Sequence, residues 1–309
     1  MSEFMTHVRS EMLAILRRNG LDDSEGMCEY LTNAGGKGLR ARLCRTAGQQ
    51  LGAQRQALTS YAALVELLHA ASLLHDDVID NARQRRGQPA AHRTWGVPRV
   101  VLLGDVIVAV VMQELAERTD RATHVYACRC LKEISVQELQ QQSQRPCVPI
   151  SVEAYRAIAA GKTGALFGLS AWLGARSAQA GLDACREVGE ISCRLGMVYQ
   201  FIDDLCDVAS AGSSTGKDAG ADRKHALLTF PVALYAERVA PHCTHVSIVE
   251  LWRELNEKPI LKETVAEGVG KIHAELRQIA DDWRALLGQT LPLVDEFMDI
   301  ARRRIIQRV

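Results

Sequence analysis

The stretch from Ala57 to Asp80, ALTSYAALVELLHAASLLHDDVID, decides the fold class. It is rich in Ala and Leu, which are strong helix formers. Its apolar residues fall on almost every side of the helix that they would form. A helix of this kind belongs in the middle of a bundle, because it must be covered all round. The stretch therefore predicts a long helix that is surrounded by others.

Helical patterns also cover most of the remaining chain, whereas sustained alternation of apolar and polar residues, the signal of strands, is nearly absent. Further helices are expected over residues 39–51, 99–117, 124–144, 152–173, 182–209 and 229–239, with two or three more after residue 246. The segments between them contain Gly, Pro, Ser or Asn, which end helices. We therefore predict an all-α helical bundle that forms a single domain over residues 1–309.

Two short acidic clusters break the pattern of an apolar bundle. They are Asp76-Asp77-Val-Ile-Asp80 and Asp203-Asp204-Leu-Cys-Asp207. In each cluster, here called a D-D-x-x-D motif, the outer two aspartates share one helical face, where like charges repel. Each motif also lies near the C-terminal end of its helix, where the helix dipole disfavours anions. A solvated acidic helix end would explain one such motif, but two copies favour a bound cation.

The ligand type indicates which cation this is. All the candidate ligands are carboxylate oxygens, without a Cys/His pair nearby, and oxygen ligands favour hard cations. Mg²⁺ fits best, because carboxylates usually bind it together with substrate phosphates. Cys206, inside the second motif, is expected to be a small packing residue.

Cationic residues next to glycines accompany the acidic motifs. They are Lys37 and Arg40 at an expected helix start, Arg85 and Arg86 after the first motif, and Lys162 and Lys217 farther along the chain. Helix N-termini and glycine turns offer N–H groups to phosphate oxygens, and Lys or Arg adds charge there. A capping turn with a solvated lysine is the alternative explanation. His69, two turns before Asp76, is a candidate phosphate donor if it faces a polar cleft, and otherwise a core histidine.

Composition limits the partners and the location. Lys plus Arg and Asp plus Glu both number 37, so the formal net charge is zero and we expect no nucleic-acid partner. The nine cysteines are scattered and odd in number, which suits a reducing compartment. The most membrane-like stretch, residues 100–112, is too short to span a bilayer. We therefore expect a cytoplasmic protein without stable membrane insertion.

The chain resembles trans-prenyl diphosphate synthases, the polyprenyl synthetase family, over about residues 35–231. The run HAASLLHDDVID (residues 69–80) with the following Arg85-Arg86-Gly87 is similar to the family's first aspartate-rich motif, and YQFIDDLCD (residues 199–207) is similar to the second. Between them, the matching residues are Gly104-Asp105, Glu138-x-x-Gln141 and Lys162-Thr163-Gly164. The resemblance implies the isoprenoid synthase fold with a central apolar cavity, and a homodimer.

The resemblance also implies a role for each group of residues. Mg²⁺, as three ions with substrate bound, would be held by Asp76, Asp77, Asp80, Asp203, Asp204 and Asp207. The allylic diphosphate would be bound by Arg85, Lys162, Thr163, Gln200 and Lys217, of which Lys162, Gln200 and Lys217 are the implied catalytic residues. Isopentenyl diphosphate would be bound by Lys37, Arg40, His69 and Arg86.

The implied reaction condenses isopentenyl diphosphate with an allylic prenyl diphosphate. Cleavage of the allylic C–O bond gives pyrophosphate and a carbocation, and metal ions and lysines would stabilise the developing negative charge. The isopentenyl double bond then attacks the cation, and the departing pyrophosphate can accept the proton that leaves. Apolar side chains below the aspartates would shield the cation from water.

The sequence departs from the family's pattern at two places. The stretch Gly35-Gly36-Lys37-Gly38-Leu39-Arg40-Ala41 lacks one Arg and the Pro that the family has there. Ahead of Leu228-Thr229-Phe230-Pro231, Ala226 and Leu227 stand where the family commonly has Gly-Lys. A usual phosphate-binding lysine is therefore missing, and Lys224 and His225 are the candidates to replace it.

Small residues before the first motif indicate a long product. One isoprene unit is about 5 Å long, close to the 5.4 Å pitch of a helix, so the helix that leads to Asp76 acts as a ruler. Ala71 and Ser72 lie one turn before the motif, where short-chain members of the family often have a large aromatic residue. Leu68 is the next candidate to stop growth. We expect a product longer than C15, broadly about C25 to C40.

Two other functions are alternatives. A terpene cyclase on the same fold would ionise one prenyl diphosphate, and it would not need the four residues assigned to isopentenyl diphosphate. A non-catalytic partner subunit of a heteromeric synthase would usually have lost aspartates, whereas both motifs are complete here. The altered sequence at Leu227 is the feature that favours the partner subunit.

Overall fold

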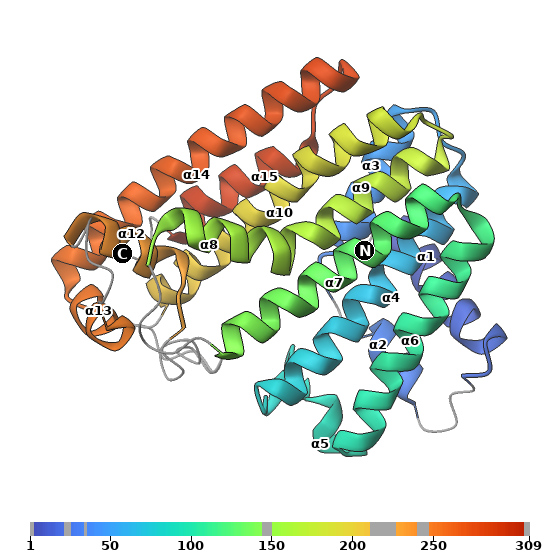
Figure 1. Cartoon of the computed structure of the whole chain (residues 1–309), viewed down its shortest axis with the longest axis horizontal. Coiled ribbons are helices and arrows are strands. Elements are labelled where there is room, and N and C mark those ends of the chain that lie inside the picture. Colours follow the sequence, from blue (N-terminus) through green and yellow to red (C-terminus); the bar gives the residue numbers. More distant parts are fainter. Residues whose placement is uncertain are drawn as a thin grey trace. The chain divides into compact units, whose positions relative to one another are not determined.

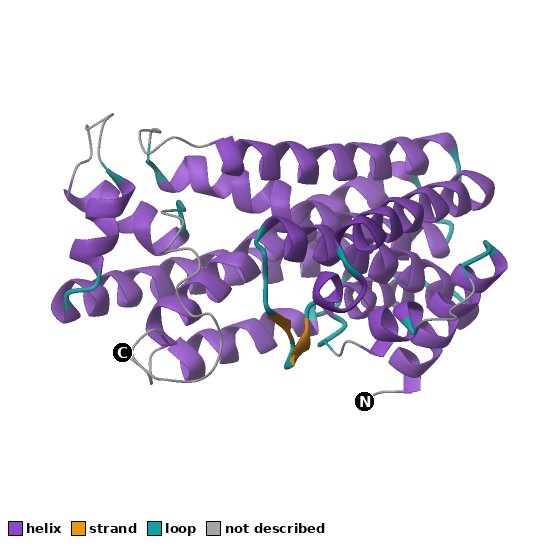
Figure 2. Ribbon diagram, turned by 90° about the horizontal axis from the view of Figure 1, so that it is seen from below, coloured by secondary structure: helices purple, strands orange, loops and turns teal. Residues whose placement is uncertain are grey.

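The computed structural model describes residues 3–21, 26–33, 36–143, 150–210, 227–239 and 247–305. Most of these residues are helical, and one short hairpin stands among the helices of the described part (Figures 1 and 2). The predicted all-α fold is therefore confirmed. The chain divides into two compact units, one of residues 1–129 and 169–189, the other of residues 130–168 and 190–309. The single domain and its central cavity stay predictions.

The first unit contains the first D-D-x-x-D motif. Its elements are α1 (Glu3–Arg18), α2 (Met27–Asn33), α3 (Leu39–Gln50), α4 (Arg55–Ile79), β1 (Gln84–Arg85), β2 (Gln88–Pro89), α5 (Ala91–Trp95) and α6 (Val97–Arg118). The first residues of α7 (Arg121–Ser143), most of α9 (Ala165–Ser177) and the start of α10 (Leu182–Ser210) also belong to it.

The second unit contains the second motif. The rest of α7 and α10 and the start of α9 belong to it. Its other elements are α8 (Val152–Ala159), the π-helix η1 (Ala160–Gly164), α12 (Phe230–Val239), α13 (Ile248–Leu255), α14 (Lys258–Leu287), α15 (Pro292–Ile300) and the π-helix η2 (Ala301–Ile305).

Helix α4 is the predicted central helix of the first unit. It begins two residues before the expected start and ends at Ile79, so that Asp80 caps its C-terminus. It packs against α1, α3 and α6, and Leu58, Leu64 and Leu67 on it are fully buried. Among the described helices, α4 is long and apolar enough to cross a membrane, whereas we expected residues 100–112 to be the most membrane-like stretch and too short to span a bilayer. Half of the most apolar stretch of α4 is buried, and the buried core helix of a folded domain can be equally long and apolar.

The structure differs from the expected helices at three places. Helices α2 and α5 were not expected, because they have only seven and five residues and show no full period. The expected continuous helix over residues 152–173 contains the π-helix η1, which widens one turn. The segment after α4 contains the β1–β2 hairpin, whose strands are too short to show a pattern of alternation.

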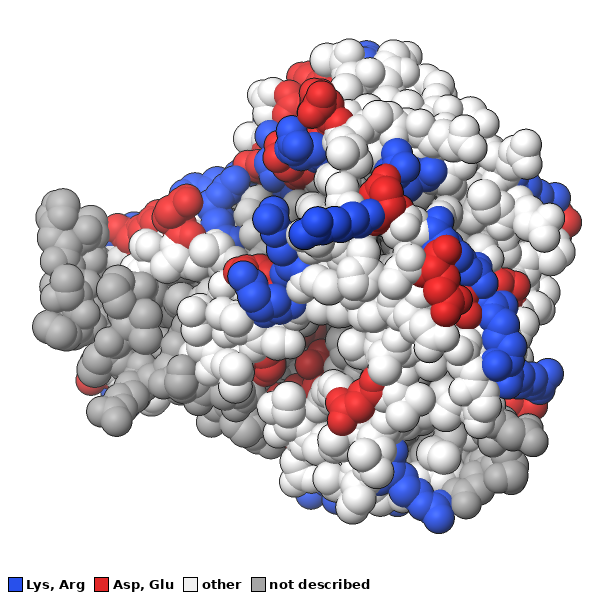
Figure 3. All heavy atoms as spheres, turned by 45° about the vertical axis from the view of Figure 1, so that its right-hand side comes forward, with Lys and Arg blue, Asp and Glu red and all other residues white. Residues whose placement is uncertain are grey.

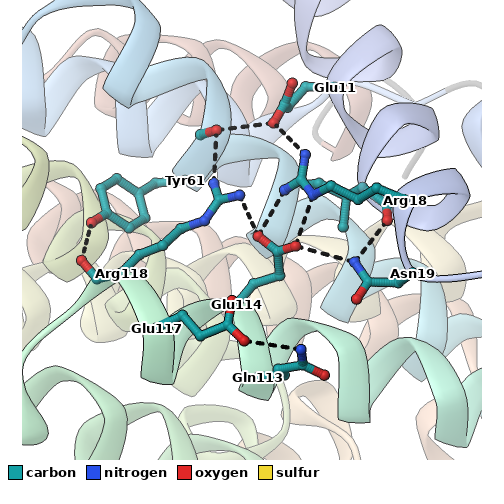
Figure 4. A network of polar contacts seen from close by, with 10 residues as sticks. Glu11, Arg18, Asn19, Tyr61, Gln113, Glu114, Glu117 and Arg118 are labelled. Carbon is teal, nitrogen blue, oxygen red and sulfur yellow. Dashed lines mark hydrogen bonds and ion pairs between the residues drawn. The ribbon is translucent and has the colours of Figure 1, made fainter.

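A network of charges joins three helices of the first unit around Glu114 of α6 (Figure 4). The Glu114 carboxylate is buried and accepts hydrogen bonds from Arg18 Nε and Nη2 at 2.9 and 2.7 Å. Asn19 donates to it at 3.1 Å, and Arg118, one turn later, forms an ion pair with it. The hydrogen bonds from Arg18 are the largest of the effects that lower the pKa of Glu114.

This network predicts a pH-dependent contribution to stability. The pKa of Glu114 is lower in the folded protein than its ordinary value of 4.5. The charged carboxylate therefore stabilises the fold at pH values above the ordinary pKa, and this contribution is lost as the pH falls through the folded-state pKa. At pH 7, Glu114→Gln should lower the free energy of unfolding by about 1 to 2 kcal/mol, because both arginines are partly exposed. At low pH, the free energies of unfolding of the wild type and of Glu114→Gln, measured by urea titration, should become equal. Glu117→Gln, an exposed neighbour on α6, should change little; an equal loss there would refute the assignment.

Candidate active site

The first D-D-x-x-D motif presents its aspartates on two sides of α4. Asp76 is partly exposed and Asp80 is exposed, whereas Asp77 is buried. The buried carboxylate of Asp77 accepts hydrogen bonds from Arg85 Nε at 2.9 and 3.1 Å and a short contact from Arg85 Nη2. The guanidinium therefore compensates the buried charge, and the outer two aspartates face the surface.

The hairpin after α4 places Arg85 and Arg86. Arg85 pairs with Gln88 across the ladder, and the two turn residues, Arg86 and Gly87, have positive φ angles of 53° and 81°, as in a type I′ turn. A Cβ atom on Gly36 would lie 2.9 Å from Arg86 Nη1. The Arg86 guanidinium thus lies close to Gly36, which directly precedes Lys37.

Tyr30 of α2 is a member of this group that sequence reasoning missed. Its hydroxyl donates to the Pro89 carbonyl at 3.1 Å, and its ring packs edge-on against Trp95 with the centroids 5.2 Å apart. Burial raises the pKa of Tyr30, and the charge of Asp77 raises it further. Tyr30 therefore holds the hairpin near the motif, and no sequence pattern around it indicated this.

His69 lies near Arg40 and Arg86, two of the residues that are grouped with it as the predicted site of isopentenyl diphosphate. Burial lowers its pKa well below the ordinary value, and the positive charges of Arg40, Arg86 and Arg85 lower it further. The ring is therefore neutral near pH 7. Its Nδ1 atom is buried and has no hydrogen-bond partner among the described residues. His69, Arg40 and Arg86 thus lie in one neighbourhood of the first unit.

His75 connects the first motif to α6. Its Nε2 atom lies 3.2 Å from the Val101 carbonyl oxygen and 3.4 Å from Asp105 Oδ1. A Cβ atom on Gly104 would lie 2.3 Å from the same nitrogen. The glycine of the Gly104-Asp105 pair is therefore needed for close approach of the ring, which fixes the helix end that carries Asp76.

The second motif repeats this construction with different partners. Asp203 and Asp207 are exposed, and Asp204 is buried. Asp204 accepts hydrogen bonds from Gln200 Nε2 at 2.9 Å and from the Phe230 backbone N–H at 3.0 Å, and a short one from the Tyr155 hydroxyl. Three donors thus compensate the buried carboxylate.

Helix η1 brings Thr163 to this motif. The Thr163 hydroxyl donates to Gln200 Oε1 at 2.7 Å, so a chain of hydrogen bonds runs from Thr163 through Gln200 to Asp204. Gly164 allows the close approach of η1 to α10, because a Cβ atom there would lie 2.6 Å from the Cys193 carbonyl oxygen. A π-helix is rare and is often found at functional sites.

Lys162, also in η1, has two partners on α7. Its Nζ atom donates to Gln141 Oε1 at 2.8 Å and forms an ion pair with Glu138 Oε2 at 2.7 Å. The two partners are the Glu138-x-x-Gln141 pair of the sequence, which lies one helical turn apart. The side chain of Lys162 is one-third exposed, so it reaches the surface of the second unit.

The remaining predicted residues divide into three groups. The chain-length residues Ala71 and Leu68 are buried in the first unit, and Ser72 donates to the His69 carbonyl at 2.9 Å. Lys217, Lys224 and His225 lie outside the described residues. Leu227, which stands in place of the family's lysine, accepts a hydrogen bond on its carbonyl oxygen from Trp252 Nε1 at 3.0 Å. This contact fixes the segment that leads to Phe230.

The described residues contain no group of three His, Cys, Asp or Glu side chains close enough to hold a metal ion. Cations and anions are also interspersed on the face in Figure 3. The described residues on this face therefore form no broad positive patch.

Comparison with known proteins identifies the class. The sequence model of the polyprenyl synthetase family matches residues 23–267. The chain therefore belongs to this family. It is 30% identical over 219 residues to the nonaprenyl diphosphate synthase of Mycobacterium tuberculosis, covering 70% of this chain and 65% of that one. It is 35% identical over 202 residues to the geranylgeranyl diphosphate synthase of the same organism, covering 64% and 57%. The matches thus span less than two-thirds of these relatives.

Solved structures show the same fold over nearly the whole chain. The polyprenyl synthase from Caulobacter crescentus complexed with calcium and isoprenyl diphosphate has a TM-score of 0.72 and 26% identity, over 99% of this chain and 98% of that one. The heptaprenyl diphosphate synthase from Staphylococcus aureus has a TM-score of 0.81 and 22% identity, over 98% and 99%. The isoprenoid synthase fold is thereby confirmed. The acidic motifs and the metal in the first of these structures fit dependence on a divalent metal ion.

The packing of Gly164 predicts a strong effect of a single methyl group. In Gly164→Ala, the Cβ atom would meet the Cys193 backbone, which has no freedom to rotate away. The free energy of unfolding should fall by at least about 2 kcal/mol. Gly270→Ala is the matched control, because no atom lies within 4 Å of the position that its Cβ would take. It should raise stability by about 0.5 to 1 kcal/mol. Similar urea midpoints for both variants would contradict the packing of η1.

Proposed function

We propose that this chain is a prenyltransferase that condenses isopentenyl diphosphate with an allylic prenyl diphosphate to give a trans-polyprenyl diphosphate. The shared construction of the two D-D-x-x-D motifs carries this proposal: in each, two outer aspartates are accessible while the middle one is buried and hydrogen-bonded. The relatives named above are synthases of polyprenyl diphosphates. This favours elongation over the terpene cyclase and the partner subunit.

Mg²⁺ is the proposed metal, with three ions when substrate is bound. The accessibility of Asp76, Asp80, Asp203 and Asp207 supports these four as ligands. Asp77 and Asp204 already accept hydrogen bonds from the protein, which supports a role in fixing the helices that present the other four. When bound, Mg²⁺ would supply positive charge to the oxygens of the departing diphosphate.

The cations near each motif would bind the two substrates. Arg85, Lys162, Thr163 and Gln200 are proposed to contact the allylic diphosphate, and Lys217, outside the described residues, would join them. Lys162 would donate to the diphosphate oxygens as the C–O bond breaks, because negative charge develops there. The carbonyl oxygen of Gln200 accepts from Thr163, so its orientation is fixed before substrate arrives.

The second substrate is proposed to bind at the group formed by Lys37, Arg40, His69 and Arg86. Two observations support this: the contact of Arg86 with the Gly36 backbone and the neutral His69 with its buried Nδ1 atom. A neutral imidazole can donate one N–H bond to a diphosphate without adding to the crowding of positive charge. A cytoplasmic location and a homodimer remain part of this proposal.

A product assay tests the function directly. Purified protein with Mg²⁺, labelled isopentenyl diphosphate and separate C5, C10, C15 or C20 starters should give labelled polyprenyl diphosphates. EDTA should abolish the activity, and excess Mg²⁺ should restore it. Asp76→Asn and Asp203→Asn should each lower kcat/KM by about 100-fold or more, the equivalent of several kcal/mol. Asp183→Asn, an exposed site on α10, should not. Starter converted to hydrocarbon or alcohol without label would indicate a cyclase instead.

A substitution at the buried Ala71 tests whether α4 controls the length of the product. If the product grows along α4, Ala71→Phe should shorten it to about C15 or C20, because the ring would fill space one turn before the motif. Chromatography of the dephosphorylated products would measure the distribution. Ala116→Phe, on the exposed side of α6, is the control and should leave it unchanged. An unaltered distribution in Ala71→Phe would mean that growth follows another path.

A further inference from the structure

The proposed diphosphate-binding lysine is paired with a carboxylate inside the same unit. Lys162 Nζ lies 2.7 Å from Glu138 Oε2, a distance at which the two charges largely neutralise each other. The proposed function does not use Glu138, which cannot bind a phosphate oxygen. Glu138 is also more deeply buried than its partner, with 15% of its side chain exposed against 34% for Lys162. The lysine is therefore the member of the pair with the greater access to solvent.

Gln141 gives the pair its geometry. Its carbonyl oxygen accepts a hydrogen bond from the same Nζ atom at 2.8 Å. This hydrogen bond and the ion pair with Glu138, one helical turn away on α7, together hold the ammonium group. The backbone of η1 approaches the same helix closely, because a Cβ atom on Gly161 would lie 2.4 Å from Gln137 Cγ. An ammonium group has three N–H donors, and one of them is donated to Gln141 on α7.

We propose that Glu138 is a positioning residue that competes with diphosphate for Lys162 and so weakens the binding of pyrophosphate. Without substrate, Glu138 and Gln141 hold the lysine in place. When diphosphate binds, the lysine exchanges all or part of the Glu138 contact for phosphate oxygens. The contribution of Lys162 to the free energy of binding is then the difference between the energy of its ion pair with phosphate and that of its ion pair with Glu138. This inference rests on the proposed role of Lys162 in diphosphate binding.

Removal of the charge should therefore strengthen binding. Glu138→Gln keeps the size of the side chain and an oxygen that can accept from Lys162, but it removes the competing charge. The dissociation constant for inorganic pyrophosphate in MgCl₂, measured by calorimetry, should fall about fivefold, the effect typical of a partly exposed ion pair. The KM for the allylic substrate should fall with it. Glu138→Ala also removes the charge and provides the same test if the first variant folds poorly.

Glu133→Gln is the matched control. Glu133 lies on α7 five residues before Glu138 and accepts a hydrogen bond from Gln137 at 2.9 Å, but it has no contact with Lys162 among those the structure gives. This variant should leave pyrophosphate binding unchanged. Thermal unfolding of all variants would show whether a change in affinity reflects folding.

A double-mutant cycle separates this inference from the proposed function. Lys162→Met should weaken pyrophosphate binding, and Glu138→Gln added to it should have no further effect. If Lys162→Met weakens binding but Glu138→Gln does not strengthen it, the competition is refuted and the role of the lysine stands. If Glu138→Gln strengthens binding equally in both backgrounds, its charge does not act through the lysine. Wild-type binding by Lys162→Met would refute the role of Lys162, and with it this inference.

Discussion

Burial of one carboxylate in each aspartate-rich motif is the constraint on which the candidate site depends. A buried carboxylate destabilises a fold unless hydrogen bonds or an opposite charge compensate it. Asp77 is compensated by one guanidinium, and Asp204 by an amide, a phenol and a backbone N–H. Either solution fixes the rotation of its helix about the helix axis. The outer aspartates are then turned to the accessible side, because they lie on a different face from the middle one.

The two solutions differ in how far along the chain they reach. Arg85 is eight residues after Asp77, so the first motif and its hairpin form one local segment. The donors to Asp204 include Tyr155, 49 residues earlier, and the Phe230 N–H, 26 residues later. The second motif therefore requires α8, α10 and the start of α12 to be assembled before its carboxylate is satisfied. Close packing at Gly161 and Gly164 serves the same assembly.

This difference explains what could be predicted from the sequence. The apolar run of α4 predicted that helix to within two residues at each end, and spacing alone placed the outer aspartates together. The arginines after the motif were noted because they are near it in sequence, but the pairing of Arg85 with Asp77 was not predicted. The roles of Tyr30 and Tyr155 were not, since their partners are distant and neither lies in a recognisable pattern. The π-helix at residues 160–164 was also missed, because a widened turn leaves the apolar period nearly unchanged.

Pairing of cations with carboxylates also bears on how a protein of zero net charge binds anions. Arg85 is bonded to Asp77, and Lys162 lies against Glu138, so neither cation adds its full charge to the surface. In the proposed site, binding of a diphosphate would replace one anionic partner with another, and its affinity would stay below that of an uncompensated cluster of charges. A synthase that repeats its reaction must release pyrophosphate after every condensation. In the proposed reaction, compensated cations would favour that release, and bound metal ions would supply the charge that the reaction needs.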